Sequence, residues 1–538
     1  PPPLIIFYPP NPPTPLRLSL VGSEMCIRDS DTGDNLATEN KDELNEPPSI
    51  YAATKKANEL CIEILEQTGL LTKANQIANT LVSKGLKAGD RVAVQAEKSV
   101  IQIALYVATI KAGGIYLPLN TGYTTNELDY FINDSSSSIV IVDSKIENKL
   151  KEILDNQNII FLTLNSDESG SLNESLIQQD EKFDPVDRKK NDLAAILYTS
   201  GTTGKSKGAM LSHKNLVSNT NVLKEAWQYS SDDTLLHMLP IYHTHGLFVA
   251  FNLLACVNGS IIFLTKFSTQ DALKWMKKST SMMGVPTFYT RLLSDEGFNH
   301  DLVKHMRLFI SGSAPLLAET HIEFENRTGK KILERYGMTE TNMNISNPYD
   351  GERKPGTVGL PLPGVQVRIA DKEGKELAKG EIGIIELRGE NIFKGYWQMP
   401  DKTKESFRDD GFFITGDMAY IDENNYVVIV GRDKDLIITG GLNVYPKEVE
   451  ELIDEIDGVV ESAVIAVPHK DFGEAVVSVV VRSNESLSED DIKNNLREKV
   501  AKFKQPKEVF FENELPRNSM GKVQKVELRE KFKNIFLN

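Results

Sequence analysis

Apolar and polar positions follow helical and strand periods in turn from about residue 66 onward. Apolar side chains recur every three or four positions over residues 70–90, which predicts an amphipathic helix ending at Gly85. A short apolar run at 91–97 predicts a strand, and the longer run at 99–114 predicts a largely apolar helix. Because strands and helices keep alternating, we expect a mostly parallel sheet with helices on both faces.

The pattern changes after residue 360, where short β segments are separated by glycine-containing and charged turns. Helical and strand patterns then continue to the C-terminus, as is typical of a compact α+β unit. We expect a large domain at 66–431 and a small, mobile domain at 432–538, joined through the charged linker 431–435. The predicted fold class is α/β: a large N-terminal domain of several subdomains with parallel sheets between helices, followed by a small α+β domain.

The first 65 residues do not share this pattern. Residues 1–16 contain eight prolines, so no regular element is expected there, and residues 18–30 resemble a translated sequencing adaptor. Residues 47–61 resemble the Tyr-x-x-x-Lys helix of short-chain dehydrogenases, with Tyr51 and Lys55 as its catalytic pair. No dinucleotide-binding glycine fingerprint precedes that helix. We therefore expect a chimeric or artefactual segment and assign it no function.

Composition narrows the classes of partner. The chain has 61 basic and 76 acidic residues and a formal net charge of −15, which argues against nucleic acid or an anionic membrane as the main partner. Three cysteines are too few for a disulfide framework and fit a reducing compartment, so we expect the cytoplasm, with an organelle matrix as the alternative. No apolar run reaches the roughly 18 residues of a membrane span, and the chain begins without the pattern of a secretory signal.

The strongest local feature is the segment YTSGTTGKSKGAMLSH, from Tyr198 to His213. Its hydroxyl groups, its unobstructed backbone N–H groups and its lysines favour a bound phosphate. The spacing is not that of a Walker loop. We expect a helix to follow directly, with its N-terminus toward the phosphate. The candidate phosphate-binding residues are Thr199, Ser200, Gly201, Thr202, Thr203, Gly204 and Lys205.

The loop TSGTTGKSKG (199–208) resembles the signature of the acyl-adenylate-forming enzymes, which include acyl-CoA synthetases, adenylation domains of peptide synthetases and firefly luciferase. The resemblance extends from about residue 66 to residue 538, in the family's order. It implies an ATP-dependent enzyme that activates a carboxylic acid as its acyl-adenylate and passes the acyl group to coenzyme A. The implied small molecules are ATP, Mg²⁺, coenzyme A and the acid.

The resemblance also implies an ATP site built from distant segments. SGSAPL (311–316) and ERYGMTET (334–341) would form the adenine pocket, and two later segments would meet the ribose hydroxyls. The implied ATP-binding residues after the loop are Gly312, Ser313, Ala314, Tyr336, Gly337, Asp417 and Arg432. Thr339 would bind phosphate, and Glu340 would hold Mg²⁺ between phosphate oxygens.

Four further positions take their roles from the resemblance. Lys522, in PRNSMGKVQK, would reach into the site and steady the charge that builds up during adenylation. Lys434 occupies the hinge position, and Gly440 and Gly441 would let the pantetheine thiol pass close to the backbone. Adenylation and thiolysis would then use two orientations of the small domain.

Two stretches of the sequence narrow the range of acids that could be the substrate. LPIYHTHGLFVAFNLL carries the family's acyl-site histidine at His243, followed by His245, and Ser311 is implied in the same site. Arg291 follows an apolar segment in which fatty substrates would keep an apolar wall. A buried cation there needs a partner, which a second substrate carboxylate would supply.

The stretch 334–365 resembles the malonyl-CoA synthetases of this family. The predicted acid is therefore malonate, with methylmalonate as the alternative. Two other hypotheses stay open: a synthetase for a short or medium fatty acid or for a carrier-protein thiol, and a catalytically silent acyl-nucleotide binder. The joint presence of Lys522, Glu340, Asp417 and Arg432 argues against the silent binder. The sequence predicts no oligomeric state.

Overall fold

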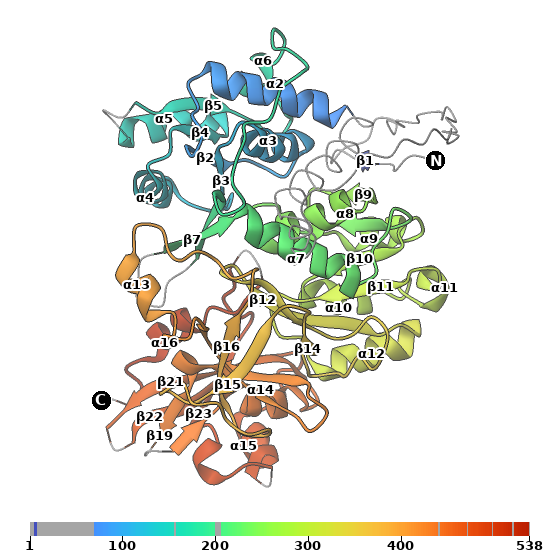
Figure 1. Cartoon of the computed structure of the whole chain (residues 1–538). Helices are drawn as coiled ribbons and strands as arrows, with labels where there is room; N and C mark the ends of the chain where they lie inside the picture. Colours follow the sequence, from blue (N-terminus) through green and yellow to red (C-terminus); the bar gives the residue numbers. More distant parts are fainter. Residues whose placement is uncertain are drawn as a thin grey trace, which may run out of the picture.

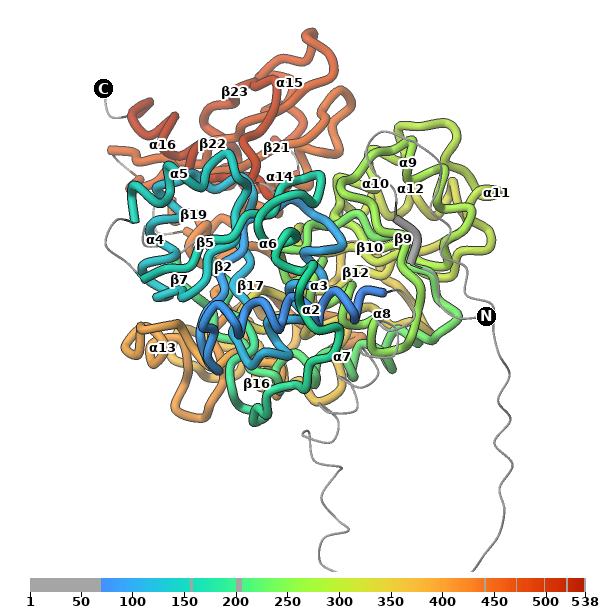
Figure 2. Tube along the Cα trace, turned by 90° about the horizontal axis from the view of Figure 1, so that it is seen from above, coloured from blue at the N-terminus to red at the C-terminus, as the bar shows by residue number. Residues whose placement is uncertain are grey.

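The computed structural model describes residues 69–154, 158–199, 206–439, 442–470, 472–497, 499–518 and 521–536, together with the backbone of 5–7. Two sheets with their helices form the large part of the molecule, and the C-terminal strands and helices lie together at the bottom of the view in Figure 1. In Figure 2 the group α8–α12 lies beside the group α2–α6, so the two large sheets are neighbours. No helix of the described residues has both the length and the apolarity to cross a membrane.

The first sheet has six strands and helices on both faces, as the sequence predicts. Its order is β5 (Ile160–Thr163), β4 (Ile139–Val142), β2 (Arg91–Gln95), β3 (Ile115–Pro118), β6 (Leu193–Thr199) and β7 (Lys207–Ser212), parallel except for the last pair. Its helices are α2 (Leu70–Ser83), α3 (Val100–Lys111), α4 (Thr125–Ser135), α5 (Ser144–Ile153) and the short α6 (Ser171–Glu174). Val92 and Val94 pack toward α2 and α3, whereas Ala93 packs toward α4 and α5. This alternation is the period-2 pattern of a strand buried on both faces.

The second sheet has eight strands and carries most of the candidate site. Its order is β1 (Ile5–Phe7), β9 (Ser260–Phe263), β8 (Thr234–His237), β10 (Ser281–Gly284), β11 (Leu308–Ser311), β12 (Ile332–Met338), β13 (Asn342–Ser346) and β14 (Leu360–Pro361). The strands run parallel through β12 and antiparallel after it. Its helical segments are α7 (His213–Ala226), the π-helix η1 (His245–Phe251), α8 (Asn252–Cys256), α9 (Thr269–Met276), α10 (Pro286–Leu293), α11 (His300–Val303) and α12 (Ala318–Thr328).

One apolar core joins the two sheets. Residues of α2 and α3 belong to the same buried cluster as η1, α8 and one face of the eight-stranded sheet. The opposite face of that sheet packs on α9, α10 and α12 in a second cluster. The carboxyl ends of β8 and β9 meet the first sheet, because Lys98 after β2 donates to the His237 and Leu264 carbonyls. The carboxyl ends of parallel strands are where open α/β folds bind ligands.

The remaining strands form two antiparallel or mixed sheets. The first contains β15 (Gln366–Ala370), β16 (Gly383–Arg388), β17 (Phe413–Ile421) and β18 (Val427–Arg432), with α13 (Pro400–Glu405) inserted. The small C-terminal domain follows the 3₁₀ turn η2 (Asp433–Asp435), and its strands are β19 (Ile437–Thr439), β20 (Leu442–Val444), β21 (Val459–His469), β22 (Gly473–Arg482) and β23 (Glu508–Glu512). Two helices, α14 (Pro446–Asp454) and α15 (Glu489–Arg497), cover one face, and α16 (Lys525–Phe532) covers the other, with the turn η3 (Lys502–Lys504) before β23.

Two sequence predictions are wrong. The prolines of 1–16 do not exclude a regular element, because Ile5–Phe7 pairs in parallel with β9. An edge position tolerates prolines just outside the strand. The phosphate loop also does not enter a helix directly, since β7 forms an antiparallel pair with β6 and the helix α7 begins only at His213. The segment 207–212 is half-buried or buried throughout and completes the edge of the sheet.

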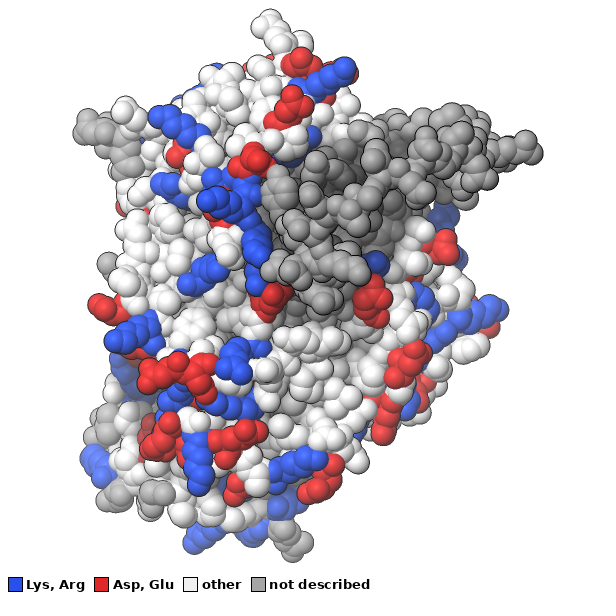
Figure 3. All heavy atoms as spheres, in the orientation of Figure 1, with Lys and Arg blue, Asp and Glu red and all other residues white. Residues whose placement is uncertain are grey.

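Acidic and basic side chains are mixed over the described part of the face shown in Figure 3. Ion pairs between side chains occur in the described residues, for example Arg368 with Asp410 (2.6 Å) and Lys354 with Asp422 (2.5 Å). The net acidic charge is therefore not concentrated in one patch on that face.

The N-terminus of α7 allows a direct test of the corrected boundary. Ser212 and Asn215 form a reciprocal capping box there, so Ser212→Ala should lower the free energy of unfolding by about 1 kcal/mol. Ser218→Ala is the control, because its hydroxyl only contacts the Asn215 carbonyl at 3.2 Å within the helix. Urea titrations measure the free energy of unfolding of both variants. Equal losses of stability in the two variants would mean that the helix does not start at this cap.

Candidate active site

The phosphate side of the site lies where the β6–β7 hairpin meets the turn between β12 and β13. The Thr199 hydroxyl donates to Glu340 Oε1 at 3.4 Å, and the Tyr396 hydroxyl donates to the same oxygen at 3.0 Å. The Lys207 ammonium lies 4.3 Å from the centre of the Tyr396 ring. Hydroxyl, ammonium and carboxylate groups from three distant segments are thus held within one small region.

Glu340 is the buried carboxylate of this region, 5% exposed. Burial raises its pKa, which Tyr396 and the more distant cations Arg432 and Lys207 partly offset. Its position is fixed by the backbone, since the Phe393 N–H donates to the Glu340 carbonyl at 2.8 Å. The described residues contain no cluster of three or more acidic, cysteine or histidine side chains that could hold a metal alone. A single carboxylate fits Mg²⁺, which usually takes one or two carboxylates and completes its shell with phosphate oxygens and water.

Several predicted residues lie outside the described part of the chain. They are Ser200, Gly201, Thr202, Thr203, Gly204 and Lys205 of the loop, Gly440 and Gly441, and the pair Tyr51 and Lys55. Thr339 is described and lies half-buried in the turn before Glu340. Gly337 lies at a register shift between β12 and β13.

The nucleoside side of the site centres on Asp417. Asp417 Oδ2 accepts a hydrogen bond of 2.6 Å from the Tyr336 hydroxyl, and its Oδ1 lies 2.7 Å from Arg432 Nε. Asp417 and Arg432 are also partners in the β17–β18 ladder. The negative charge of Asp417 is the main reason that the pKa of Arg432 is raised. The structure therefore brings together the three residues that the sequence places at adenine and ribose, while Ala314 is half-buried after β11.

Lys522 reaches this same region from the small domain. Its N–H donates to Asn518 Oδ1 at 2.9 Å, which shapes the loop before α16. A Cβ on Gly521 would lie 3.6 Å from the Thr287 hydroxyl, so the loop passes next to α10 of the large domain. Burial and the positive charge of Arg432 lower the pKa of Lys522 to about 8, against an opposing effect of Asp417. The side chain is nevertheless exposed by its accessible area, so solvent screens these interactions and the direction of the shift matters more than its size. Lys434, in η2, is exposed.

The acid side contains two histidines at the start of η1. The His245 N–H donates to His243 Nδ1 at 3.3 Å, and His245 Nδ1 lies 3.2 Å from Ser313 Oγ. Burial and the charge of Arg335 lower the pKa of His243 to about 4 and that of His245 well below its usual value. Both rings are therefore neutral at pH 7.

Arg335 is a buried cation that the sequence analysis missed. It is 3% exposed, and burial lowers its pKa to about 9, opposed only by Tyr289. In the described structure its Nε and Nη2 atoms have no hydrogen-bond partner, and the same holds for Ser311 Oγ and His245 Nε2. A Cβ on Gly312 would lie 2.4 Å from the guanidinium carbon, so the Gly312 backbone lies directly against Arg335.

Arg291 is not the buried cation that the sequence led us to expect. It is exposed near the end of α10, so the argument from burial is wrong for this residue. Thr287 lies one helical turn earlier on the same face and adjoins the loop of Lys522. The role of Arg291 in binding the acid stays a prediction.

The sequence contained a signal for Arg335 but none for Tyr396. Arg335 directly precedes Tyr336, and neighbouring side chains of a strand point to opposite faces. A charged residue next to a predicted adenine-binding tyrosine in a central strand therefore indicates a polar site on the other face. Tyr396 lies in a segment without regular secondary structure. No sequence pattern there distinguishes it from the other aromatic residues of the chain.

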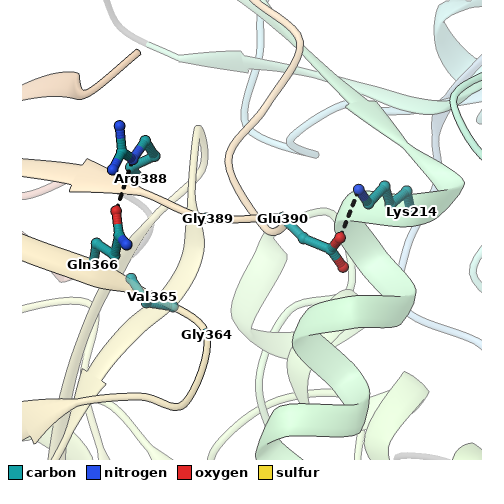
Figure 4. Close-up of a pocket in the computed structure, with 7 residues that line it drawn as sticks. All are labelled: Lys214, Gly364, Val365, Gln366, Arg388, Gly389 and Glu390. Atoms are coloured by element: carbon teal, nitrogen blue, oxygen red, sulfur yellow. Dashed lines mark hydrogen bonds and ion pairs between the residues drawn. The ribbon is translucent and has the colours of Figure 1, made fainter. Parts of the chain in front are cut away.

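A further hollow lies away from these clusters, between α7 and the β15–β16 sheet (Figure 4). Lys214 and Arg388 line it, but each is already paired: Lys214 with Glu390 at 2.7 Å and Arg388 with the Gln366 side-chain oxygen at 2.7 Å. We assign it no role in the reaction.

The fold and the three clusters define an AMP-forming acyl-CoA synthetase, a ligase that uses ATP. The chain belongs to the AMP-binding enzyme family, because that family matches residues 68–397 and the AMP-binding enzyme C-terminal domain matches residues 448–522.

The relatives of this chain are named for different acid substrates. A malonate–CoA ligase of Arabidopsis thaliana is 34% identical over 483 residues, covering 83% of this chain and 78% of that protein. A long-chain-fatty-acid–CoA ligase of Bacillus subtilis is 33% identical over 503 residues, covering 86% and 89%. The crystal structure of ATP-bound MatB from Rhodopseudomonas palustris is 54% identical, with a TM-score of 0.87, and the match covers 89% of this chain and 99% of that one.

The charges around Lys522 predict that two substitutions shift the pKa of Lys522 in opposite directions. Because Arg432 lowers the pKa of Lys522 and Asp417 raises it, Arg432→Met should raise that pKa and Asp417→Asn should lower it. Titration of ¹³C-methylated lysines by NMR, with Lys522→Arg to assign the signal, measures both. Shifts of the same sign in the two variants would contradict this arrangement.

Proposed function

We propose that this enzyme joins malonate to coenzyme A through a malonyl-adenylate, with methylmalonate as a second acid of the same kind. The observation that carries the proposal is the buried Arg335 guanidinium, with unpartnered N–H groups beside the two histidines of the acid side. The similarity to ligases whose names specify malonate supports the same acid.

A carboxylate is the group that best completes this environment. Leaving a buried cation unpaired costs several kcal/mol, whereas a carboxylate can accept two parallel hydrogen bonds from a guanidinium. A fatty acid would place hydrocarbon against the same N–H groups and leave them unsatisfied. Malonate carries one carboxylate to react and a second, one carbon away, to pair with Arg335.

Gly312 sets where the guanidinium lies. Since a Cβ at this position would overlap the guanidinium carbon at 2.4 Å, any side chain would displace Arg335 from its place against the Gly312 backbone. The absence of a side chain at 312 is therefore part of the proposed recognition of the second carboxylate.

The first half-reaction joins the acid to the nucleotide. A carboxylate oxygen of malonate attacks the α-phosphorus of ATP, the bond to the bridging oxygen of the β-phosphate breaks, and pyrophosphate leaves. Thr199, Lys207 and the loop 200–205 hold phosphate oxygens, and Lys522 donates to oxygens that gain charge, so catalysis is positioning and electrostatics. Mg²⁺ held by Glu340 supplies further neutralisation of phosphate charge.

The second half-reaction transfers the acyl group. The thiol of coenzyme A loses its proton and attacks the malonyl carbonyl, and AMP leaves. We place the domain boundary at 431/432 and the hinge at Lys434, which lies in the short turn η2 between β18 and β19. Rotation there withdraws Lys522 and brings Gly440 and Gly441 toward the acyl group.

A panel of acids tests the function as a whole. Pyrophosphate release and thioester formation are measured with malonate, methylmalonate, propionate, butyrate and octanoate, each with and without coenzyme A. We expect sustained turnover with malonate and coenzyme A, and little with the monocarboxylic acids. Preference for octanoate would replace the proposal with a fatty acyl-CoA synthetase, and ATP binding without turnover of any acid would indicate a silent binder.

Arg335→Met tests the proposed carboxylate site. Removal of one partner of a buried charge pair typically costs 2–5 kcal/mol, so kcat/KM for malonate should fall by roughly 30-fold to 3,000-fold. The KM for ATP should change by less than about threefold, since Asp417 and Tyr336 hold the nucleoside separately.

Arg291→Leu is the matched comparison, because Arg291 is a cation of the same type but exposed. We expect a smaller loss of malonate kcat/KM than for Arg335→Met. A larger loss in Arg291→Leu would move the carboxylate site to α10, and an unchanged value in both variants would contradict a dicarboxylate substrate.

A further inference from the structure

Lys98 is a fully enclosed lysine that none of the roles above uses. It follows β2, is 8% exposed, and reaches across to the carboxyl ends of β8 and β9 in the other large sheet. Its ammonium lies 2.8 Å from His237 Nδ1, 3.0 Å from the His237 carbonyl and 2.6 Å from the Leu264 carbonyl. The Phe263 ring adds a cation–π contact at 4.2 Å.

The hydrogen bonds fix how many protons Lys98 and His237 share. His237 Nε2 lies 2.8 Å from the Gly246 carbonyl and must carry a hydrogen there. The two carbonyls at Lys98 require two of its N–H groups. The remaining contact, between Nζ and Nδ1, needs one more proton, so the pair carries one positive charge in total.

The proton of that contact belongs to Lys98. Burial lowers the pKa of both groups, but that of His237 falls to about 3. An ammonium has three N–H groups and here finds three acceptors, which offsets part of the cost of burial. His237 is therefore neutral and held as the tautomer with its hydrogen on Nε2.

This tautomer clamps the start of the π-helix η1. Gly246 is the second residue of η1, and a Cβ on it would lie 2.0 Å from the Pro240 carbonyl. The Gly246 backbone is thus held between Pro240 on one side and His237 on the other. His245 and His243 precede it directly and lie against Ser313 and the positive charge of Arg335.

We propose that Lys98 and His237 are positioning residues for the acid: Lys98 sets the tautomer of His237, and His237 holds Gly246 so that η1 presents His243 and His245 to the substrate. π-Helical turns are strained and recur at functional sites. Without the clamp, η1 can relax toward an α-helix and rotate both histidines. The proposal rests on the proposed function only in taking this region as the acid side.

Two substitutions of His237 distinguish the effect of its hydrogen bond to the Gly246 carbonyl from the effect of side-chain packing. His237→Gln keeps a donor where Nε2 was and can still bond the Gly246 carbonyl. His237→Asn keeps a polar group near Nδ1 and Lys98 but cannot reach Gly246. The third variant, Lys98→Met, removes the charge and frees the His237 tautomer.

Thr280→Val is the matched control for lost stability. The Thr280 hydroxyl donates a half-buried hydrogen bond of 2.7 Å to Asp233 at the opposite end of the same strands. Its removal should lower Tm without reaching the acid side.

Steady-state KM values for acid and for ATP, with Tm, are measured for the full chain and each variant. The acid is the one that the unaltered protein converts best. Failure of malonate as that acid would count against the proposed function alone, and the comparison of variants stays decisive.

We expect His237→Asn and Lys98→Met to raise the KM for acid about tenfold. His237→Gln should stay within about threefold, and the KM for ATP should change by less than about twofold in every variant. The proposal is overturned if His237→Gln and His237→Asn behave alike, if the KM values for acid and ATP rise together, or if Thr280→Val raises the KM for acid equally. Should Lys98→Met fail to fold, the comparison of the two His237 variants decides alone.

Discussion

The carboxylate of Asp417 is the contact on which the arrangement of the site depends. It accepts a hydrogen bond from Tyr336 on the eight-stranded sheet at 2.6 Å and binds Arg432, at the end of β18, at 2.7 Å. It also acts on Lys522, which comes from that small domain. One buried charge therefore joins Tyr336 to Arg432 and also raises the pKa of Lys522, which belongs to the small domain.

The proposed acid side depends on a different constraint, because the described residues supply no carboxylate partner for the buried charge of Arg335. Arg335 leaves two nitrogens unsatisfied, and the Lys98–His237 pair adds a second charge a short way behind the histidines. An unsatisfied buried cation such as Arg335 is costly in the empty protein and favours an anion that completes its hydrogen bonds, whereas the Lys98 ammonium already has three acceptors. The neutral state of His243 and His245 then leaves the guanidinium as the cation that meets the acid.

The sequence pointed to the residues of the nucleoside side because they sit in contiguous motifs whose order is that of the family, and their roles stay predictions. Glu340, Tyr336, Asp417, Arg432 and Lys522 do converge. It failed where a role depends on packing between distant segments. Arg335 is buried because Gly312 lies against it, Lys98 meets His237 across 139 residues, and no local pattern reports either contact. The sequence analysis also places a helix directly after the phosphate loop, where the structure has the strand β7. The helix α7 starts only at the capping box of Ser212.

The central claim is that the enzyme forms an adenylate with an acid that carries a second carboxylate. Malonate-dependent exchange of labelled pyrophosphate into ATP, in the absence of coenzyme A, tests it most directly, because exchange requires reversible formation of the adenylate. The account predicts rapid exchange with malonate and little with propionate, which differs from malonate in having a methyl group where the second carboxylate would be. Equal exchange with the two acids, or exchange with neither, would contradict it.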